Sequence, residues 1–411
     1  MYSRDLHNRP ETPLQHICIV TETFPPEING VALTLSHLVK GLRARGHTVS
    51  VVRPRQRNDF RDRESDPLTT LVRGLPLPGY RGLQFGLPAG RLLRHIWTRY
   101  RPDVAYIATE GPLGWSAAGA ARHLDIPAFS GFHTNYHSYS RHYRLGWLER
   151  LVFRYLCGFH NRTAGTLVPT ADLRDRLRAL GFKDVTLMGR GVDSQLFGPH
   201  RRCAELRRDW GVSDSDLAIL YVGRLAPEKN LAVAVEAYRF IKKKRESVKF
   251  VLVGDGPLRR SLQNEHRDLI FRGMQTGEQL ATHYASADMF LFPSETETFG
   301  NVTLEAMASG LAVVAYDYAA ARLHIKNGDT GVLVPYGDSK AFIDSAASLV
   351  LETQAIDRIR RQAREYVASI SWSQVVETFE LLVTGVQEQF SEEPDSMATP
   401  RGVAVAAGGR A

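Results

Sequence analysis

The sequence is poor in features that would each mark a class of protein. Cysteine occurs three times in 411 residues, at Cys18, Cys157 and Cys203, without paired spacing. This argues against a disulfide framework or a cysteine zinc site and favours a reducing compartment. No apolar run approaches the roughly 20 residues that a membrane-spanning helix needs. Residues 1–13 are polar and lack the apolar core of a signal peptide, so we expect a soluble, cytoplasmic protein.

Motifs of metal and redox chemistry are also missing. There is no HExxH motif, and the histidines at 137, 142 and 160 do not have zinc-ligand spacing. No GxGxxG follows the first apolar run, so a dinucleotide redox enzyme has no support. We therefore expect neither a metal site nor a bound cofactor.

Charge is distributed unevenly. Residues 1–200 hold 27 Lys+Arg against 16 Asp+Glu, and residues 201–411 hold 25 against 28, which gives +11 and −3 and accounts for the net charge of +8. The excess indicates contact with nucleic acid, a phosphate-bearing substrate or an acidic membrane; a scattered, solvated basic surface is the alternative. The arginines are scattered and no nucleic-acid recognition module is present, so we expect no nucleic-acid partner.

The hydrophobic pattern predicts an α/β fold. Short apolar runs alternate with segments of 3.6-residue periodicity, which is typical of βαβ units and a parallel sheet. The pattern occurs in both halves, and the length also suits two domains. We expect strands at 16–21, 48–52, 104–108, 128–131, 166–169, 217–222, 249–253, 269–272, 289–292, 312–315 and 331–334, and helices at 33–42, 115–123, 231–244, 258–265, 277–286, 302–309, 356–367 and 372–389.

These elements predict two Rossmann-like, doubly wound parallel-sheet domains that face each other across a cleft. The expected divisions are a flexible N-terminus at 1–13, an N-terminal domain at 14–197, a C-terminal domain at 198–370, a helix at 371–390 that packs back on the N-terminal domain, and a disordered tail at 391–411. Ligands of such sheets bind at the carboxyl ends of the strands, so the cleft is the expected site.

The most informative segment is 293–305, which follows an expected strand and begins a helix. Glu297 lies in the loop and Glu305 about one turn into the helix. Gly300 lets a ligand approach the backbone, and the free N–H groups of the helix start suit phosphate or other polar oxygens. The two carboxylates suit sugar hydroxyls, although glutamates near a helix start also serve simply to complement its dipole.

Other strand ends carry further candidates. Arg224 and Lys229 follow the strand at 217–222 and could clamp a diphosphate. Asp255 and Gly256 follow the next strand, but alone they indicate only a turn. In the N-terminal half, Asn29 and Gly30 lie at the first strand–helix junction, where a glycine allows one phosphate or sugar to approach. His133 follows the strand at 128–131, and the residue alone fits a structural role as well as a functional one.

Together these segments resemble the retaining glycosyltransferases of family 4, which have the GT-B fold. ETFGNVTLE at 297–305 resembles the EX7E motif of that family, and YVGRLAPEK at 221–229 resembles its GR(x)4K donor-phosphate motif. TETFPPEING at 21–30 resembles its N-terminal loop, and GRGVDSQLF at 189–197 resembles its interdomain segment. The resemblance extends from about residue 17 to residue 372.

The resemblance implies roles for individual residues. Arg224 and Lys229 would hold the donor pyrophosphate and stabilise the charge on the leaving nucleoside diphosphate, a task that needs no metal in this fold. Glu297 would contact the donor sugar, Glu305 the ribose, and His133 would position hydroxyls near the sugar and acceptor. The remaining donor-binding residues would be Asn29, Gly30, Gly223, Asp255, Gly256, Phe299, Gly300, Asn301 and Val302. In the family the anomeric configuration is retained.

The acceptor is indicated by residues 136–163, where arginines flank an amphipathic helical pattern. A core helix with a basic solvent side and a membrane-facing helix both fit. The region resembles the glycolipid-forming branch, with its sulfoquinovosyl-, glucosyl- and glucuronosyl-diacylglycerol synthases and GDP-mannose-dependent alpha-mannosyltransferases. It implies transfer of a hexose from a UDP-hexose, a UDP-hexuronate or GDP-mannose to a membrane lipid such as diacylglycerol, by an enzyme peripheral on the cytoplasmic membrane face.

Three alternatives remain open. One is a GDP-mannose-dependent mannosyltransferase of polysaccharide or lipopolysaccharide assembly. A more remote one is a GT-B nucleotide-sugar epimerase, against which the EX7E pattern argues. The third is a basic nucleic-acid-binding protein, which would need a recognition module that the sequence does not show.

Overall fold

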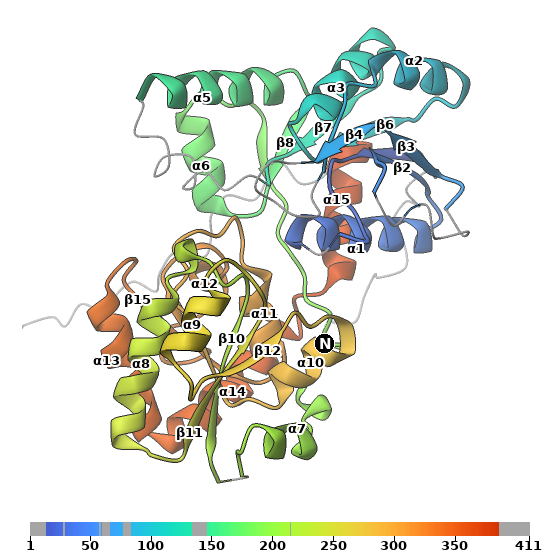
Figure 1. The fold of residues 1–411 in the computed structure, drawn as a ribbon. Helices are drawn as coiled ribbons and strands as arrows, with labels where there is room; N and C mark the ends of the chain where they lie inside the picture. The colour runs from blue at the N-terminus through green and yellow to red at the C-terminus, as the bar shows by residue number, and fades with distance from the viewer. Residues whose placement is uncertain are drawn as a thin grey trace, which may run out of the picture.

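The computed structural model describes residues 14–27, 29–56, 59, 66–76, 84–133, 146–213 and 215–385. They form two α/β units, one above the other in Figure 1, each built on its own parallel sheet. The prediction of two parallel-sheet domains is therefore confirmed. The expected N-terminal segment 1–13 and tail 391–411 lie outside the described residues, as do residues 136–145 of the expected acceptor helix.

The N-terminal sheet has seven parallel strands in the order β3-β2-β1-β6-β7-β8-β9. Its strands are β1 His16–Val20, β2 Thr48–Pro54, β3 Thr69–Val72, β6 Val104–Ile107, β7 Ala128–Gly131, β8 Gly165–Val168 and β9 Val185–Leu187. A separate antiparallel pair is formed by β4 Gly74–Pro76 and β5 Gln84–Gly86. β1 is the third of the seven strands, so its carboxyl end lies in the interior of the sheet rather than at an outer strand.

Helices cover both faces of this sheet. They are α1 Gly30–Ala44, α2 Gly90–Arg99, α3 Pro112–His123, α5 Gly146–His160 and α6 Ala171–Ala179. Alternate residues of β1 enter different hydrophobic clusters, because successive strand side chains point to opposite faces. Ile17 and Ile19 pack with residues of α1, whereas Cys18 and Val20 pack with residues of α2 and α3.

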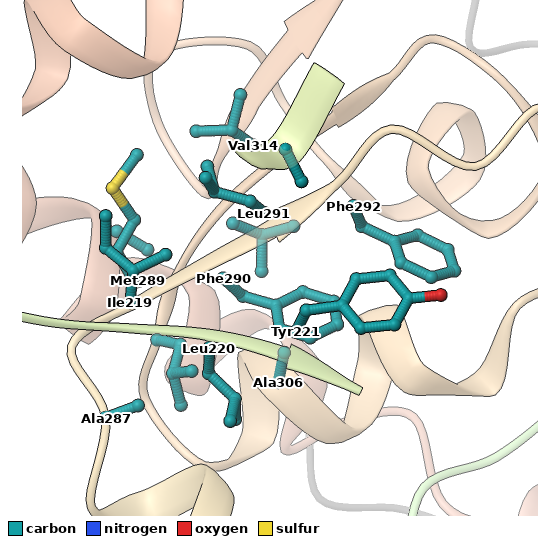
Figure 2. Packing of buried hydrophobic residues seen from close by; sticks show 14 of the residues in the cluster. Ile219, Leu220, Tyr221, Ala287, Met289, Phe290, Leu291, Phe292, Ala306 and Val314 are labelled. Carbon is teal, nitrogen blue, oxygen red and sulfur yellow. The ribbon is translucent and has the colours of Figure 1, made fainter. Parts of the chain in front are cut away.

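The C-terminal sheet has six parallel strands in the order β12-β11-β10-β13-β14-β15. These are β10 Leu217–Val222, β11 Val248–Val253, β12 Ile270–Gly273, β13 Met289–Phe292, β14 Ala312–Tyr316 and β15 Val332–Val334. The α-helices are α7 Ala204–Asp209, α8 Leu231–Lys244, α9 Arg259–Glu265, α10 Gly277–Ala285, α11 Asn301–Ala308, α12 Ala319–His324, α13 Ser339–Leu351 and α14 Thr353–Val367, and short 3-10 helices are η2 Pro199–Arg201 and η3 Pro227–Lys229. Figure 2 shows β10 and β13 side chains such as Tyr221, Phe290 and Phe292 packed in the core of this unit.

The last described helix, α15 Trp372–Thr384, returns to the N-terminal unit and lies beside α1 (Figure 1). Its Phe379 packs edge-on against Tyr106 of β6, with ring centroids 4.9 Å apart. Its Glu380 is buried and accepts hydrogen bonds from Arg45 and from His47, the latter at 3.0 Å. The chain therefore crosses between the units twice, and the second crossing ends in a packed helix.

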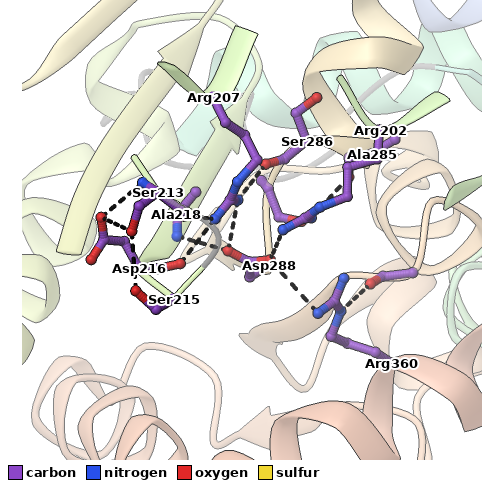
Figure 3. A network of polar contacts seen from close by, with 12 residues as sticks. Arg202, Arg207, Ser213, Ser215, Asp216, Ala218, Ala285, Ser286, Asp288 and Arg360 are labelled. Atoms are coloured by element: carbon purple, nitrogen blue, oxygen red, sulfur yellow. Dashed lines mark hydrogen bonds and ion pairs between the residues drawn. The ribbon is translucent and has the colours of Figure 1, made fainter. Parts of the chain in front are cut away.

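A polar network secures the start of the C-terminal unit (Figure 3). The Asp288 carboxylate, just before β13, accepts hydrogen bonds from Arg202 at 2.9 Å, Arg207 at 3.0 Å and the backbone N–H of Ala218 at 2.9 Å. Arg360 of α14 lies 3.6 Å from the same carboxylate. The Arg207 side chain is 2% exposed, so this carboxylate compensates a charge that is removed from water.

Candidate active site

The candidate residues of the two units meet where the loops after β1 and β7 lie against the start of α11. Thr298 Oγ1 donates a hydrogen bond to the backbone carbonyl of His133 at 3.0 Å. A Cβ atom built on Gly30 would lie 3.9 Å from Asn301 Nδ2. The structure thus brings the N-terminal loop and the EX7E segment together from positions some 270 residues apart in the sequence.

Lys229 and Glu297 form an ion pair at the carboxyl end of β13. The Lys229 ammonium lies 2.5 Å from Glu297 Oε1 and also donates to the Thr296 carbonyl at 3.1 Å. Ser294 Oγ donates to the same carboxylate oxygen at 2.7 Å. Both ionic side chains are less than one-fifth exposed, so solvent screens the pair only partly. A ligand that binds the ammonium must compete with this carboxylate.

The loop between β13 and α11 presents its backbone at the helix start. Gly300 caps α11 with φ +92°, a left-handed conformation that strains a side-chain-bearing residue. Phe299 is buried, and its carbonyl accepts a hydrogen bond from Ala320 N at 2.8 Å. Val302 lies in the first turn of the helix and is partly buried. The unpaired N–H groups of this turn can donate to anionic or hydroxyl oxygens.

Glu305 is a buried carboxyl on α11, with its side chain directed into the C-terminal unit. The residue is 8% exposed, and Tyr284 O–H donates to its Oε2 at 2.9 Å. Burial raises the pKa of Glu305 to about 7, and the Tyr284 hydrogen bond opposes that shift without cancelling it. The carboxyl therefore titrates near neutral pH.

Two glycine turns hold the proposed phosphate-binding loop. Leu225 N donates to the Asp255 carbonyl at 2.9 Å, and Leu258 N donates to the Leu225 carbonyl at 2.9 Å. A Cβ on Gly256 would lie 2.3 Å from the Leu225 carbonyl oxygen, so only glycine allows these loops to approach so closely. Gly223, at the end of β10, bonds through its N–H to Val253 O at 3.0 Å.

The charged members of these loops have local partners. The Arg224 side chain is 45% exposed and lies 3.4 Å from Glu228, and Asp255 pairs with Arg259 at 2.9 Å. The Arg224 guanidinium therefore lies near the surface. Because it is exposed, a change of side-chain rotamer is enough to redirect it.

Asn29 is used to start α1. Its Oδ1 accepts hydrogen bonds from Val31 N at 3.1 Å and Ala32 N at 2.9 Å, and its Nδ2 donates to Thr23 Oγ1 at 2.6 Å. This is the ordinary capping role of an asparagine. In this conformation the Asn29 side chain is engaged in these hydrogen bonds.

His133 is half-buried and contacts two buried polar side chains, a grouping that the sequence pattern did not predict. Arg190 Nη2 lies 2.9 Å from His133 Nδ1, and the Tyr106 hydroxyl lies 3.2 Å from His133 Nε2. Burial, followed by the charge of Arg190, holds the pKa of His133 well below its usual range. Arg190 lies within the interdomain motif at 189–197, but nothing in that motif distinguishes its side chain from a solvated one.

Glu22 is a second feature that sequence analysis missed. It follows β1, and its Oε1 accepts a hydrogen bond from Leu113 N, in the first turn of α3, at 3.2 Å. Burial raises the pKa of Glu22 to about 7, and nearby Glu110 adds to the shift. A Cβ on Gly111 would lie 2.1 Å from this carboxylate, so the glycine leaves space for it.

Within the described ranges, no three His, Cys, Asp or Glu side chains gather in a group that could hold a metal ion. None of the helices described has the length and apolarity to cross a bilayer.

Comparisons with known proteins agree with these motifs. The family model described as Glycosyltransferase Family 4 matches residues 28–196, and the one described as Glycosyl transferases group 1 matches residues 216–352. A GDP-mannose-dependent alpha-mannosyltransferase of Corynebacterium glutamicum is 33% identical over 359 residues, covering 87% of this chain and 85% of that protein. An alpha-monoglucosyldiacylglycerol synthase of Streptococcus pneumoniae is 28% identical over 313 residues, covering 73% of this chain and 70% of that protein.

The fold also matches a solved structure. Sucrose-phosphate synthase from Thermosynechococcus elongatus superposes with a TM-score of 0.72 at 19% identity, covering 90% of this chain and 98% of that one. At this identity the likeness concerns the fold, whereas the family rests on the sequence matches. The resemblance drawn from the motifs is confirmed: the chain belongs to glycosyltransferase family 4 and is a glycosyltransferase of the GT-B fold that uses nucleotide sugars.

Proposed function

We propose that the chain is a retaining hexosyltransferase that moves a hexose from a nucleotide sugar to a membrane lipid without a metal ion. The observation that carries this proposal is the Lys229–Glu297 ion pair, which lies next to the Thr298–His133 contact between the two units. A cation and a carboxylate in contact where two α/β units meet suit a substrate with a diphosphate and a hydroxyl-rich sugar.

In the proposed mechanism, donor binding divides this pair. The diphosphate draws Lys229, together with the exposed Arg224, and the two cations stabilise the charge that develops on the leaving nucleoside diphosphate. Glu297, released from Lys229, accepts hydrogen bonds from the donor sugar. Glu305 accepts hydrogen bonds from the ribose, and the backbone at 299–302 binds further oxygens of the donor.

The first test of this mechanism compares two lysines that each pair with an acid. Lys229→Ala and Glu297→Ala should each nearly abolish transfer and leave the fold intact, because both side chains are partly exposed. Lys242→Ala is the matched control, since Lys242 pairs with Asp268 at 2.9 Å on α8 and is not among the candidate site residues. Unchanged turnover of Lys229→Ala or Glu297→Ala would remove that residue from the mechanism.

For the donor we propose GDP-mannose, with a UDP-hexose or UDP-hexuronate as the alternative. The support is the relative from C. glutamicum, whose name specifies GDP-mannose. The test is thermal stabilisation by a panel of GDP- and UDP-sugars with EDTA present. A donor at one hundred times its dissociation constant should stabilise the protein by about 2.7 kcal/mol. Stabilisation by UDP-sugars alone would overturn the choice of GDP-mannose, and stabilisation that EDTA abolishes would overturn metal independence.

For the acceptor we propose a lipid such as diacylglycerol, reached through α5. Leu151 and Tyr155 are 50% and 43% exposed on this helix, beside the exposed Arg150 and Arg154. Exposed apolar groups flanked by arginines suit an anionic membrane surface. The name of the S. pneumoniae relative, a diacylglycerol glycoside synthase, also supports a lipid.

Vesicle flotation tests this surface. Vesicles of anionic phospholipid should bind the protein at low salt and release it at high salt, because the arginine contribution is screened. Leu151→Glu should weaken binding, whereas Leu351→Glu, at a leucine 60% exposed on α13 of the other unit, should not. Equal binding by both variants would refute the role of α5. Transfer to a soluble glycan, with none to diacylglycerol, would instead favour polysaccharide or lipopolysaccharide mannosylation.

A further inference from the structure

His133 is held from both ring nitrogens. Arg190 has only N–H groups to offer, so His133 Nδ1, 2.9 Å from Arg190 Nη2, must be an acceptor. An imidazole that accepts at Nδ1 is neutral and carries its proton on Nε2. That proton is then donated to the Tyr106 hydroxyl oxygen, 3.2 Å away. The surroundings therefore specify one tautomer.

The same surroundings fix the ring in place. A Cβ on Gly131 would lie 2.3 Å from the Tyr106 hydroxyl and 2.6 Å from His133 Nε2, so the glycine leaves the space in which this hydrogen bond forms. Arg190 is 5% exposed and is held by the carbonyls of Met188 at 3.3 Å and Gly189 at 3.2 Å. Among the described residues, no carboxylate contacts its guanidinium, so the histidine is its side-chain partner.

His133 also contacts the loop between β13 and α11. Its backbone carbonyl accepts the Thr298 hydroxyl at 3.0 Å, and Thr298 is the neighbour of Glu297. A chain of contacts therefore runs from Arg190 through His133 to the loop that holds the Lys229–Glu297 pair. A displacement of the His133 ring would therefore also move the His133 backbone, which contacts the loop of Glu297 and Thr298.

We propose that Arg190 is a positioning residue of the transfer site: it locks His133 as the neutral Nε2–H tautomer and thereby fixes the loop after β7 against the Glu297 loop. His133 then neither accepts nor supplies a proton during transfer. Tyr106 assists as the acceptor of the Nε2 proton. The effect on transfer rests on the proposed function, whereas the tautomer can be measured without any substrate.

The first experiment is 15N NMR of the full chain labelled in histidine, with His133→Asn to assign the His133 signals. In the wild type, Nδ1 should resonate as an unprotonated ring nitrogen and Nε2 as a protonated one. Arg190→Lys keeps a donor and should keep this pattern. Arg190→Met fills the space without a donor, and a protonated Nδ1 should then appear. A protonated Nδ1 in the wild type, or an unchanged tautomer in Arg190→Met, would overturn the proposal.

The second experiment separates positioning from direct contact with the diphosphate. Arg190→Met should lower kcat by on the order of 100-fold, because small displacements at a reacting centre cost that much, and Arg190→Lys should recover part of it. The dissociation constants of GDP and UDP should change less than twofold. A tenfold loss of nucleotide affinity would mean that Arg190 binds the diphosphate itself, which would refute action through His133. If no nucleotide sugar reacts with the wild type, the proposed function fails, and the NMR result still decides the tautomer.

Discussion

If Glu305 accepts hydrogen bonds from the ribose as proposed, nucleotide binding depends on pH through the ionisation of this carboxyl. Burial raises the pKa of Glu305 to about 7, so the carboxyl is mostly protonated at pH 6 and mostly ionised at pH 8. Ribose hydroxyls donate hydrogen bonds, and a carboxylate accepts them more strongly than a carboxylic acid. We therefore expect nucleotide binding to select the ionised form.

The magnitude follows from this selection. If only the ionised form binds, the apparent dissociation constant is multiplied by 1 + 10^(pKa − pH), which is about 11 at pH 6 and about 1.1 at pH 8. Affinity for GDP or UDP should therefore fall about tenfold between pH 8 and pH 6, equivalent to about 1.4 kcal/mol. Isothermal titration calorimetry at several pH values measures this directly.

The matched variant is Glu305→Gln, which keeps the shape and cannot ionise. The terminal phosphate of the nucleotide also titrates near pH 6, and this contribution is common to both proteins. The prediction therefore concerns the difference: the wild type should lose about tenfold more affinity than Glu305→Gln over the same range. Parallel pH profiles would show that Glu305 ionisation is not linked to nucleotide binding.

The stability of the folded protein changes with pH in the opposite direction to nucleotide affinity. Between pH 4.5 and 7 the folded chain retains a proton on Glu305 that the unfolded chain has lost, so the unliganded protein loses stability as pH rises through this window. The loss attributable to Glu305 is at most about 3 kcal/mol, and Glu305→Gln should not show it. A chemical denaturation series from pH 4.5 to 8 tests this expectation.

Three further changes have defined outcomes. Asp288→Ala leaves the buried Arg207 without its carboxylate and should lower the free energy of unfolding by about 3–5 kcal/mol in urea denaturation; a loss below about 1 kcal/mol would mean that backbone carbonyls suffice. Gly256→Ala forces the Leu225 loop apart and should weaken nucleotide binding while cooperative unfolding persists, so unchanged affinity would contradict the loop contact. Glu22→Gln removes an acid whose pKa burial raises to about 7, so it should raise the melting temperature at pH 8 and not at pH 5; equal effects at both would contradict that ionisation.

Much of the fold could be predicted from the sequence because its strands are short, apolar and separated by clear helical periods. The expected strands at 128–131, 217–222 and 289–292 coincide with β7, β10 and β13, and the expected helix at 231–244 coincides with α8. Strands whose residues are only partly buried were harder to predict, because they lack a continuous apolar run. β3 Thr69–Val72 is partly exposed along three of its four residues. α13 Ser339–Leu351 is a different case, because Phe342, Ala346 and Val350 recur at helical spacing and could have indicated a helix.

The residues of the candidate site also fall into those that the sequence could predict and those that it could not. Glu297 and Lys229 could be identified because each follows a strand at the edge where ligands bind, and the structure places them in contact. Their pairing could not be read from positions 68 residues apart. Arg190 and Glu22 could not be identified from the sequence, because their roles depend on burial and on contacts with residues of other elements. A charged residue in a sequence is usually solvated, and only packing reveals when it is not.

The contacts within each unit are stronger than the polar contacts between the units, and this difference predicts where the molecule can move. The buried interactions lie within a unit or in α15, where Phe379 and Glu380 are almost fully covered. The polar contacts described across the donor face are of another kind: Thr298 makes one neutral hydrogen bond to His133, and Arg322 pairs with Asp172 at 2.7 Å with both side chains about half exposed. Contacts of these two types each contribute about 1 kcal/mol or less. These two contacts therefore hold the faces weakly, and we expect the backbone to bend at the crossings at 193–199 and near Ser371. We expect donor binding to offset the Lys229–Glu297 pair as well as these two contacts, and thereby to change the distance between the units, as closure around a substrate requires.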